Sequence, residues 1–431
     1  MMNRRRFFST SMALTASSAG LGLLPTEQSS ISAVEKNGRQ PRVAFIGTWV
    51  KTHSHAQHFL DRLTEGYSWQ GQWQKPRIDL ASVYIDQFPE GDLARGRVDR
   101  HQLRLCSTIE EALTLGTGKL AVDGIVIIGE HGNYPKNEKG QTLYPRYRWF
   151  KQCVRVFEAS GRSVPIFNDK HLSTEWNECV EMVDDSRRLK FPFLAGSSLP
   201  VTWRHPSVEM PRDADLAESV CVAYGGIDSY DIHALETAQC MSERRKGGES
   251  GVVRVQSLRD ENVWKLLEHK DRSITQRLFI AALCRSHNLP VETGYPTNAV
   301  SLEWARSVFP KITAYHLEHA DGFRTTIFLT GIRDFNYAGY RRDTDEIVSC
   351  QMYLPMPGHG STTADFFNPL TRHIENTIIH GQTPYPIERT LLTSGMVIAG
   401  VNSLHDGESV VETPHLNITY AAPDNSAFWR D

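Results

Sequence analysis

The apolar residues of the first 200 positions fall into short runs separated by amphipathic stretches. The runs at 42–47, 77–86, 122–132, 163–169 and 191–198 have the length and composition of buried strands. Between them, 54–66, 107–116, 147–161 and 174–190 carry apolar residues at helical spacing. Strands that alternate with helices predict a doubly wound parallel sheet, a Rossmann-like domain over residues 41–200.

The pattern changes after residue 200. A helical stretch at 231–245 leads into the alternating segments 251–258, 312–319, 324–331 and 347–355. Alternation with a period of two is typical of antiparallel strands. Two helices around a proline-rich turn follow, between 366 and 410. We therefore predict an α+β domain with a large, mainly antiparallel sheet over residues 201–420.

The N-terminus carries a targeting pattern. Arg4, Arg5 and Phe8 precede a modestly apolar stretch rich in alanine, serine, glycine and leucine. This order resembles a twin-arginine export signal, and a disordered basic tail is the alternative. We treat residues 1–40 as signal and linker and expect an exported, periplasmic or extracytoplasmic protein. No other segment approaches the ~20 apolar residues that span a bilayer, so we expect no membrane span after processing.

The composition argues against nucleic-acid binding and against zinc-knuckle or disulfide-rich proteins. The chain has 431 residues, a formal net charge of −3 and 40% hydrophobic residues. Nothing in that balance favours a nucleic-acid partner. The seven cysteines are widely scattered without a CxxC pair, which argues against zinc knuckles and disulfide scaffolds. A globular protein with a small-molecule substrate is the expectation that remains.

The residues that follow the predicted parallel strands are the first candidates for a site, because ligands of open parallel sheets bind beyond the carboxyl ends of the strands. These residues are Gly47, Thr48, Trp49, Asp86, Glu130, His131, Asp169, Lys170 and His171. An acid at the position of Asp86 commonly accepts hydrogen bonds from a nucleotide ribose, although it could also be a loop residue or helix cap. The turn after the first strand, GTWVKTHSHAQH, has one glycine, so its spacing does not form the dinucleotide fingerprint.

The same turn suggests a metal. His53, His55 and His58, with His131 and His171 on neighbouring strand ends, could ligate zinc or manganese. The alternative is that these histidines bond locally or face solvent.

A second pair of residues suggests acid–base chemistry. A lysine such as Lys170 can hold a hydroxyl or carbonyl oxygen while a histidine such as His233 moves its proton near neutral pH. Glu236 lies one helical turn after His233 and could orient its ring, and Asp228 and Asp231 precede it. An amphipathic helix with a satisfied histidine is the alternative.

Four segments together resemble the Gfo/Idh/MocA oxidoreductase family. DKHL at 169–172 is similar to the family's E-K-P motif, and GGIDSYDIHALE at 225–236 to its substrate-domain helix, with Ser229 where the family has Asp. AGSSLPVTWRHP at 195–206 resembles the segment that leaves the Rossmann domain, and residues 366–410 the C-terminal helices. Exported bacterial proteins with these motifs are the branch that the chain resembles most.

The resemblance implies a Rossmann domain that binds NAD or NADP and a substrate domain that can form a homo-oligomer through an open sheet face. It implies catalytic roles for Lys170, His233, Glu236 and Asp228. It gives Lys170, with Asp169 beside it, a contact with the nicotinamide, and the strand-end residues Gly47, Thr48, Trp49, Asp86 and Glu130 are the other candidate cofactor contacts. It implicates Arg204 in substrate binding, and His171 and Asp231, in or beside the matched motifs, are the further candidates.

Three functional hypotheses follow. The first is an exported NAD(P)-dependent oxidoreductase acting on a sugar, cyclitol or related hydroxyl compound. The second is a metal-assisted lyase or hydrolase that uses His53, His55, Glu130 and His131. The third is a carbohydrate-binding protein in which Trp149, Trp176 and Trp203 stack on sugar rings, although core positions are the alternative for these tryptophans.

Overall fold

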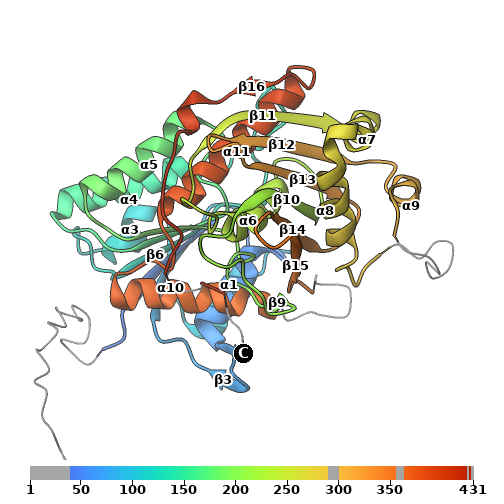
Figure 1. Ribbon diagram of the computed structural model, residues 1–431. Coiled ribbons are helices and arrows are strands. Elements are labelled where there is room, and N and C mark those ends of the chain that lie inside the picture. The colour runs from blue at the N-terminus through green and yellow to red at the C-terminus, as the bar shows by residue number, and fades with distance from the viewer. Residues whose placement is uncertain (1–38, 290–299, 356–363, 425–426, 429–431) are drawn as a thin grey trace, which may run out of the picture.

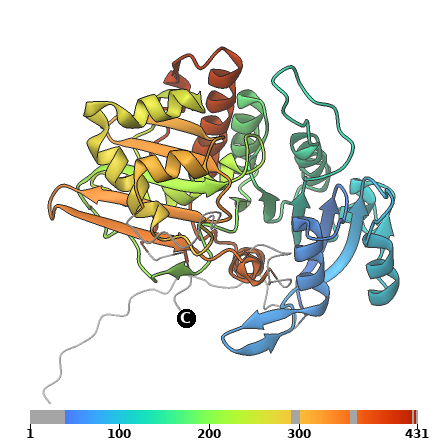
Figure 2. The same ribbon diagram turned by 90° about the vertical axis from the view of Figure 1, so that its right-hand side faces the viewer.

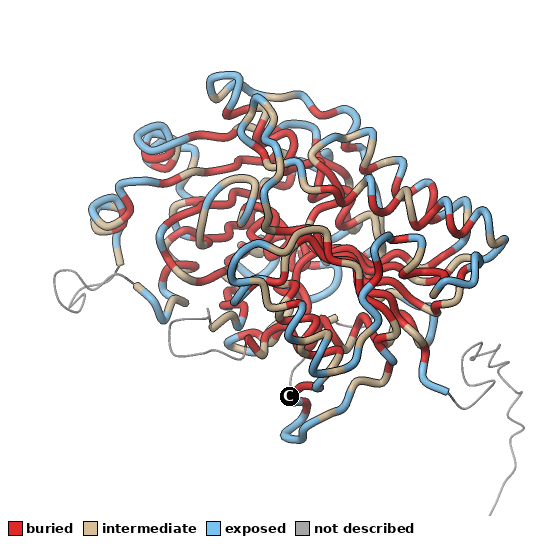
Figure 3. The backbone as a smooth tube through the Cα atoms, turned by 180° about the vertical axis from the view of Figure 1, so that it is seen from behind, coloured by how far each residue is buried: buried red, intermediate tan, exposed pale blue. Residues whose placement is uncertain are grey.

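The computed structural model describes residues 39–289, 300–355, 364–424 and 427–428, so the predicted export signal lies outside it. Two sheets with their covering helices stand beside each other (Figures 1 and 2). Buried residues gather in the interior of the molecule, and exposed residues lie mostly at the outer turns (Figure 3). Within the described ranges, no helix is long and apolar enough to cross a bilayer.

The first sheet confirms the predicted doubly wound domain. Its six strands are all parallel and lie in the order β5-β4-β1-β6-β7-β8. Without the hairpin described below, this is the order 3-2-1-4-5-6 of dinucleotide-binding folds, with the topological switch between β1 and β6. The strands are β1 (Arg42–Gly47), β4 (Asp79–Ile85), β5 (Leu105–Cys106), β6 (Gly124–Ile128), β7 (Ile166–Asp169) and β8 (Phe193–Gly196).

Helices cover both faces of this sheet. One face packs against α3 (Ile109–Thr114), α4 (Arg146–Ser160) and α5 (Trp176–Arg188). The other packs against α1 (His55–Glu65) and α10 (Asn368–His380), while α2 (Ala94–His101) lies between β4 and β5 along the chain. A Cβ added to Gly124 of β6 would lie 2.7 Å from the side chain of Ile378, so α10 returns from the far end of the sequence onto the first sheet. The domain boundary near residue 200 stays a prediction.

Local sequence signals explain where these helices begin and end. The Ser54 side chain accepts a hydrogen bond from the amide of Gln57 at the start of α1. Thr108 caps α3 in the same way, and the Glu111 carboxylate accepts the amide of Ser107 in return. Gly161 ends α4 in the left-handed conformation, as the glycine at this place in the sequence predicts.

A short hairpin explains the unusual distance between β1 and Asp86. β2 (Tyr67–Trp69) and β3 (Gln72–Gln74) pair antiparallel between α1 and β4. The segment 65–76 is therefore an insertion ahead of the second parallel strand, and Asp86 still stands at that strand's carboxyl end.

The second sheet is large and mainly antiparallel, as predicted. Its order is β16-β11-β12-β13-β10-β14-β15-β9, and only the β10–β13 pair among these described strands is parallel. The strands are β9 (Arg204–His205), β10 (Leu216–Tyr224), β11 (Val252–Arg259), β12 (Thr313–His319), β13 (Arg324–Thr330), β14 (Phe335–Arg341), β15 (Glu346–Met352) and β16 (Val411–Glu412).

Both faces of the second sheet are covered, which corrects one expectation. Helices α6 (Asp231–Ser242) and α11 (Ile387–His405) pack on one face. The other face packs against α7 (Glu261–Glu268), α8 (Ser273–Leu283) and α9 (Leu302–Val308), where Trp264 and Phe279 are buried against strand residues. The sheet face expected to be open for a homo-oligomer is therefore occupied by this chain's own helices.

Candidate active site

A cavity of about 180 Å³ lies at the carboxyl ends of β6 and β7, between the two sheets. Loop residues after the parallel strands line it on one side, and α6 and the start of β14 line it on the other. Its lining consists of His53, His55, His58, Glu130, His131, Tyr144, Arg146, Lys170, His171, Ser198, Leu199, Asp228, Ser229, Tyr230, His233, Phe335, Leu354, Phe366 and Phe367. Of the strand-end and helix residues that the sequence singled out, the cavity lining includes Glu130, His131, Lys170, His171, Asp228 and His233.

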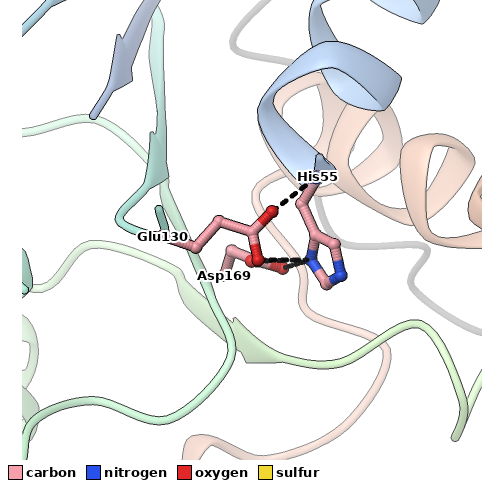
Figure 4. Close-up of side chains that lie close together, drawn as sticks. All are labelled: His55, Glu130 and Asp169. Atoms are coloured by element: carbon pink, nitrogen blue, oxygen red, sulfur yellow. Dashed lines mark hydrogen bonds and ion pairs between the residues drawn. The ribbon is translucent and has the colours of Figure 1, made fainter. Parts of the chain in front are cut away.

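His55, Glu130 and Asp169 form a cluster beside this cavity (Figure 4). His55 Nδ1 lies 2.8 and 3.0 Å from the two carboxylate oxygens of Asp169 and 4.0 Å from Glu130 Oε2. The backbone amide of His55, at the start of α1, donates to Glu130 Oε1. A carboxylate on the first amide of a helix is stabilised by the helix dipole.

Lys170 joins the cluster through Glu130. Its Nζ lies 2.6 Å from Glu130 Oε2. Burial alone would lower the pKa of Lys170, but the carboxylates of Glu130 and Asp169 outweigh it and hold that pKa above its usual value. Burial likewise opposes ionisation of Glu130, and His55, Lys170 and His131 overcome it and keep the pKa of Glu130 well below its usual range. The pair is therefore charged at neutral pH.

Four lining residues have left-handed backbone conformations, with positive φ at His53, His131, Lys170 and Asp228. Such conformations cost roughly 1–2 kcal/mol each in residues other than glycine. Local bonds hold Lys170 there, since its amide donates to the Gly196 carbonyl at 3.1 Å. Strain of this kind is common at functional sites, and here it sets the direction of the Lys170 side chain.

Two neutral histidines complete the cavity. Burial, reinforced by nearby Lys170, lowers the pKa of His233 well below its usual value. Burial and Arg146 do the same for His171. Neither His233 Nδ1 nor either ring nitrogen of His171 has a hydrogen-bond partner within the described part of the chain. Both rings are therefore buried neutral imidazoles, and these nitrogens have no protein partner among the described residues.

In this fold a dinucleotide pyrophosphate binds at the start of the helix after β1, and here side chains of the protein occupy that position. The His55 amide donates to the Glu130 carboxylate and the Gln57 amide donates to Ser54, so these amides are not available to a pyrophosphate. The Thr48 hydroxyl donates to the Glu130 carbonyl across β1 and β6.

Five of the predicted cofactor residues lie outside the cavity lining, namely Gly47, Thr48, Trp49, Asp86 and Asp169. Asp86 accepts hydrogen bonds from the hydroxyls of Tyr84 and Tyr134, both at 2.7 Å. Gly47 and Trp49 lie next to the switch point without lining the cavity.

Three residues predicted to contact the substrate or to act in catalysis lie outside the cavity lining and make contacts within the protein. Glu236 accepts from the Ser197 amide at 2.6 Å and from the Thr390 hydroxyl at 3.3 Å, so its hydrogen bonds among the described residues hold the domain junction and not the His233 ring. Asp231 is buried under the start of α6 and accepts from the amides of Asp228 and Ile232 and from Tyr315. Arg204 lies in a separate region, with its guanidinium 3.8 Å from the Phe428 ring.

Asp228 lines the cavity, but its carboxylate is hydrogen-bonded to the loop before α4. Its carboxylate accepts from the Thr142 amide at 2.8 Å and from Gln141 Nε2 at 3.3 Å. It therefore ties the loop before α4 to the loop before α6, and positions the cavity wall between the two sheets.

Several lining residues carried no signal in the sequence. Arg146, at the start of α4, donates to the His171 carbonyl at 2.6 Å and holds that loop. Tyr230, Phe335 and Phe367 place aromatic rings around His233 and His55. Trp149, Trp176 and Trp203, proposed for sugar stacking, do not line the cavity, and Trp149 is a core residue.

Glu236 leads to a prediction on stability. Burial raises its pKa to about 8, so the folded protein keeps a proton that the unfolded chain releases above its ordinary pKa of about 4.3. The free energy of unfolding should therefore fall as the pH rises from 5 to 8. Glu236→Gln, which resembles the protonated form, should remove this pH dependence, and its free energy of unfolding at pH 8 should exceed that of the wild type by roughly 4–5 kcal/mol.

Urea unfolding at several pH values measures this difference. Glu110→Gln, at an exposed position of α3, is the matched control and should follow the wild type. Parallel curves for the wild type and Glu236→Gln would contradict the prediction.

Comparisons with known proteins place the fold but not the chemistry. No family model matches the sequence, and no curated protein matches it. Among solved structures, GenD2 from gentamicin A biosynthesis, in complex with NAD, has a TM-score of 0.53 at 12% identity, over 91% of this chain and 99% of that chain. Myo-inositol dehydrogenase from Lactobacillus casei, in complex with NAD(H) and myo-inositol, has a TM-score of 0.52 at 8% identity, over 90% and 99%.

A putative myo-inositol dehydrogenase from Sinorhizobium meliloti has a TM-score of 0.51 at 11% identity, over 86% of this chain and 99% of that chain. The two-domain fold expected from the Gfo/Idh/MocA resemblance is confirmed by these neighbours. At such identities the likeness extends to the fold and not to individual site residues.

Proposed function

We propose that the protein is an enzyme that transfers a proton on a small polyhydroxylated compound, of the sugar or cyclitol class, bound in the cavity between the two sheets. One observation carries this proposal: Lys170 from the first domain and His233 from the second line the same cavity. One is held charged and the other neutral. Groups whose environments push their charge states apart are typical of acid–base pairs.

The two residues have complementary roles. The Lys170 ammonium binds the reacting hydroxyl or carbonyl oxygen and stabilises negative charge that develops on it. The His233 imidazole, which lines the cavity, accepts the proton. Glu130 positions the ammonium at 2.6 Å and keeps it protonated. Burial of the site excludes water and strengthens each of these interactions.

The cavity surface supports the substrate class. Tyr230, Phe335 and Phe367 supply apolar ring faces. Lys170, His171 and His233 supply polar groups to the same cavity. A sugar or cyclitol ring has the same division, with C–H groups on its faces and hydroxyls at its edge.

Alcohol oxidation with NAD or NADP is one reaction of this kind, and the fold shared with GenD2 and the inositol dehydrogenases supports it. The cofactor would supply hydride transfer. In their present arrangement, however, the turn residues do not fit a pyrophosphate, because Glu130 holds the His55 amide. The roles of Lys170 and His233 therefore do not depend on a dinucleotide. Release of stoichiometric nicotinamide dinucleotide from the denatured protein would contradict the conclusion that this turn does not fit a pyrophosphate.

A substrate panel in D₂O tests the proposal. Sugars, cyclitols and their keto forms are incubated with the purified protein, with and without added NAD or NADP in oxidised and reduced form, and conversion or deuterium incorporation is followed by NMR. We expect one compound class to react, and His233→Gln to slow the reaction about 10²–10⁴-fold, as loss of a general base does. A panel without any reaction, or an unchanged rate in His233→Gln, would contradict it.

We also propose that the protein is exported through the twin-arginine route, because Arg4, Arg5 and Phe8 precede an apolar stretch. The paired substitution Arg4→Lys with Arg5→Lys should retain the protein in the cytoplasm, since the receptor reads both arginines. Cell fractionation followed by immunoblotting measures the distribution. Arg39→Lys with Arg42→Lys, beyond the predicted signal, is the control. Equal export of both paired variants would exclude this route.

A further inference from the structure

We propose that His55, Glu130 and Asp169 bind one divalent cation, of the zinc or manganese class, at the start of α1. One imidazole nitrogen and two carboxylates form a donor set that suits these ions. Three protein ligands with a further open position are typical of catalytic rather than structural metal sites.

The spacing of the donor atoms suits such an ion. One donor atom from each of the three residues lies within 4.8 Å of the others. Bonds of about 2.1 Å in tetrahedral geometry separate two ligand atoms by about 3.4 Å. His55 Nδ1 lies 2.8 Å from Asp169 and 4.0 Å from Glu130, so small side-chain rotations meet this requirement.

The element positions explain why these three residues meet. Asp169 and Glu130 follow neighbouring parallel strands, β7 and β6, whose carboxyl ends share one edge of the sheet. His55 opens α1, the helix that follows the adjacent strand β1. The Thr48 hydroxyl binds the backbone carbonyl of Glu130, and the His55 amide binds its carboxylate, so the carboxylate is already directed toward the start of α1.

An independent observation also indicates a ligand at this place. His233 has 6% of its surface exposed, and its Nδ1 has no hydrogen-bond partner among the described residues. Its ring centroid lies 5.8 Å from that of His55. A buried imidazole without a partner carries a desolvation cost that a bound ion, or a water or substrate oxygen on that ion, would offset.

The charge balance is compatible with a cation. Glu130 and Asp169 contribute two negative charges, and Lys170 is the ammonium in direct contact with Glu130. Lys170 lies on Glu130 Oε2, the oxygen 4.0 Å from His55 Nδ1, so the ion would share this oxygen with the ammonium, whereas the carboxylate of Asp169 faces the imidazole. A divalent ion between His55 and the two carboxylates would polarise a substrate oxygen next to Lys170. Of the histidines considered from the sequence, His55 is the one that the geometry selects.

Metal titration of the full-length protein tests this site without any assay of activity. Chelator-treated protein is titrated with Zn²⁺ and with Mn²⁺ by calorimetry, and bound metal is counted by elemental analysis. We expect one equivalent to bind. His55→Gln and Asp169→Asn should each weaken binding at least 100-fold, whereas His53→Gln, on the same turn but outside the cluster, should not change it.

Folding is checked separately by circular dichroism, and Glu130→Gln provides a third ligand variant if one of the others does not fold. Absence of binding by the folded wild type, or equal affinity in folded ligand variants and His53→Gln, would overturn the proposal. The proton-transfer function has its own readout in the D₂O panel, so the failure of one proposal is distinguishable from the failure of the other.

Discussion

Replacing Lys170 with methionine should reduce turnover at least a thousandfold, the largest effect on activity that we expect from one substitution. The Lys170 ammonium is held 2.6 Å from Glu130 and lines the cavity beside His233. Removing a preorganised charge from a buried site typically costs two to three orders of magnitude in rate, and Lys170 also orients the substrate oxygen. Steady-state rates on the compound identified by the D₂O panel measure the loss.

Two variants separate chemistry from folding. Lys170→Met leaves Glu130 buried without its ammonium, so Lys170→Met combined with Glu130→Gln removes that uncompensated charge. Lys151→Met, whose ammonium pairs with Glu181 and Asp185 on the outer helices, should retain full activity. A folded Lys170→Met protein with wild-type turnover would remove Lys170 from the mechanism.

The largest expected effect on stability is at Arg389. Its guanidinium donates to both carboxylate oxygens of Glu243, at 2.9 and 2.5 Å, and both side chains are almost fully buried. The pair joins α11 to the end of α6, and Tyr420 donates to the same carboxylate at 2.8 Å. Removing one partner leaves a buried charge uncompensated, so Arg389→Met should lower the free energy of unfolding by about 3–5 kcal/mol.

Chemical denaturation measures this change. Arg187→Met, which breaks an exposed pair with Glu388, should cost at most about 1 kcal/mol. Arg389→Met combined with Glu243→Leu should recover much of the loss, because the unpaired carboxylate is then gone. A change below about 1 kcal/mol in Arg389→Met would show that the pair is not buried as described.

The sequence predicts the first domain well because its signals are local. Each parallel strand is a continuous apolar run, since both faces of the sheet are covered. Caps such as Ser54 and Thr108, and the terminating Gly161, mark helix ends by hydrogen bonds within a few residues. Because ligands of such sheets bind beyond the strand ends, the order of strands is enough to select Glu130 and Lys170, and both line the cavity.

The features that the sequence does not predict depend on contacts between distant segments. The hydrophobic pattern does not predict strand β10. This strand lies in the centre of the second sheet and is buried on both faces, so its residues do not alternate between apolar and polar as expected for that sheet. Glu236 has the helical spacing to orient His233, yet the Ser197 amide from the other domain binds it instead. The contact of Glu130 with the first turn of α1 has no local signal either, since it requires the carboxylate to cross from β6 to the helix.

A double-mutant cycle on Lys170 and His233 tests most directly whether the two domains act on one molecule. Turnover is measured for Lys170→Met, His233→Gln and the combined variant. Residues that act as a unit in one step are strongly non-additive, so we predict that the combined variant is about as slow as the slower single variant. Rate losses that multiply would show independent roles and contradict a shared substrate between Lys170 and His233.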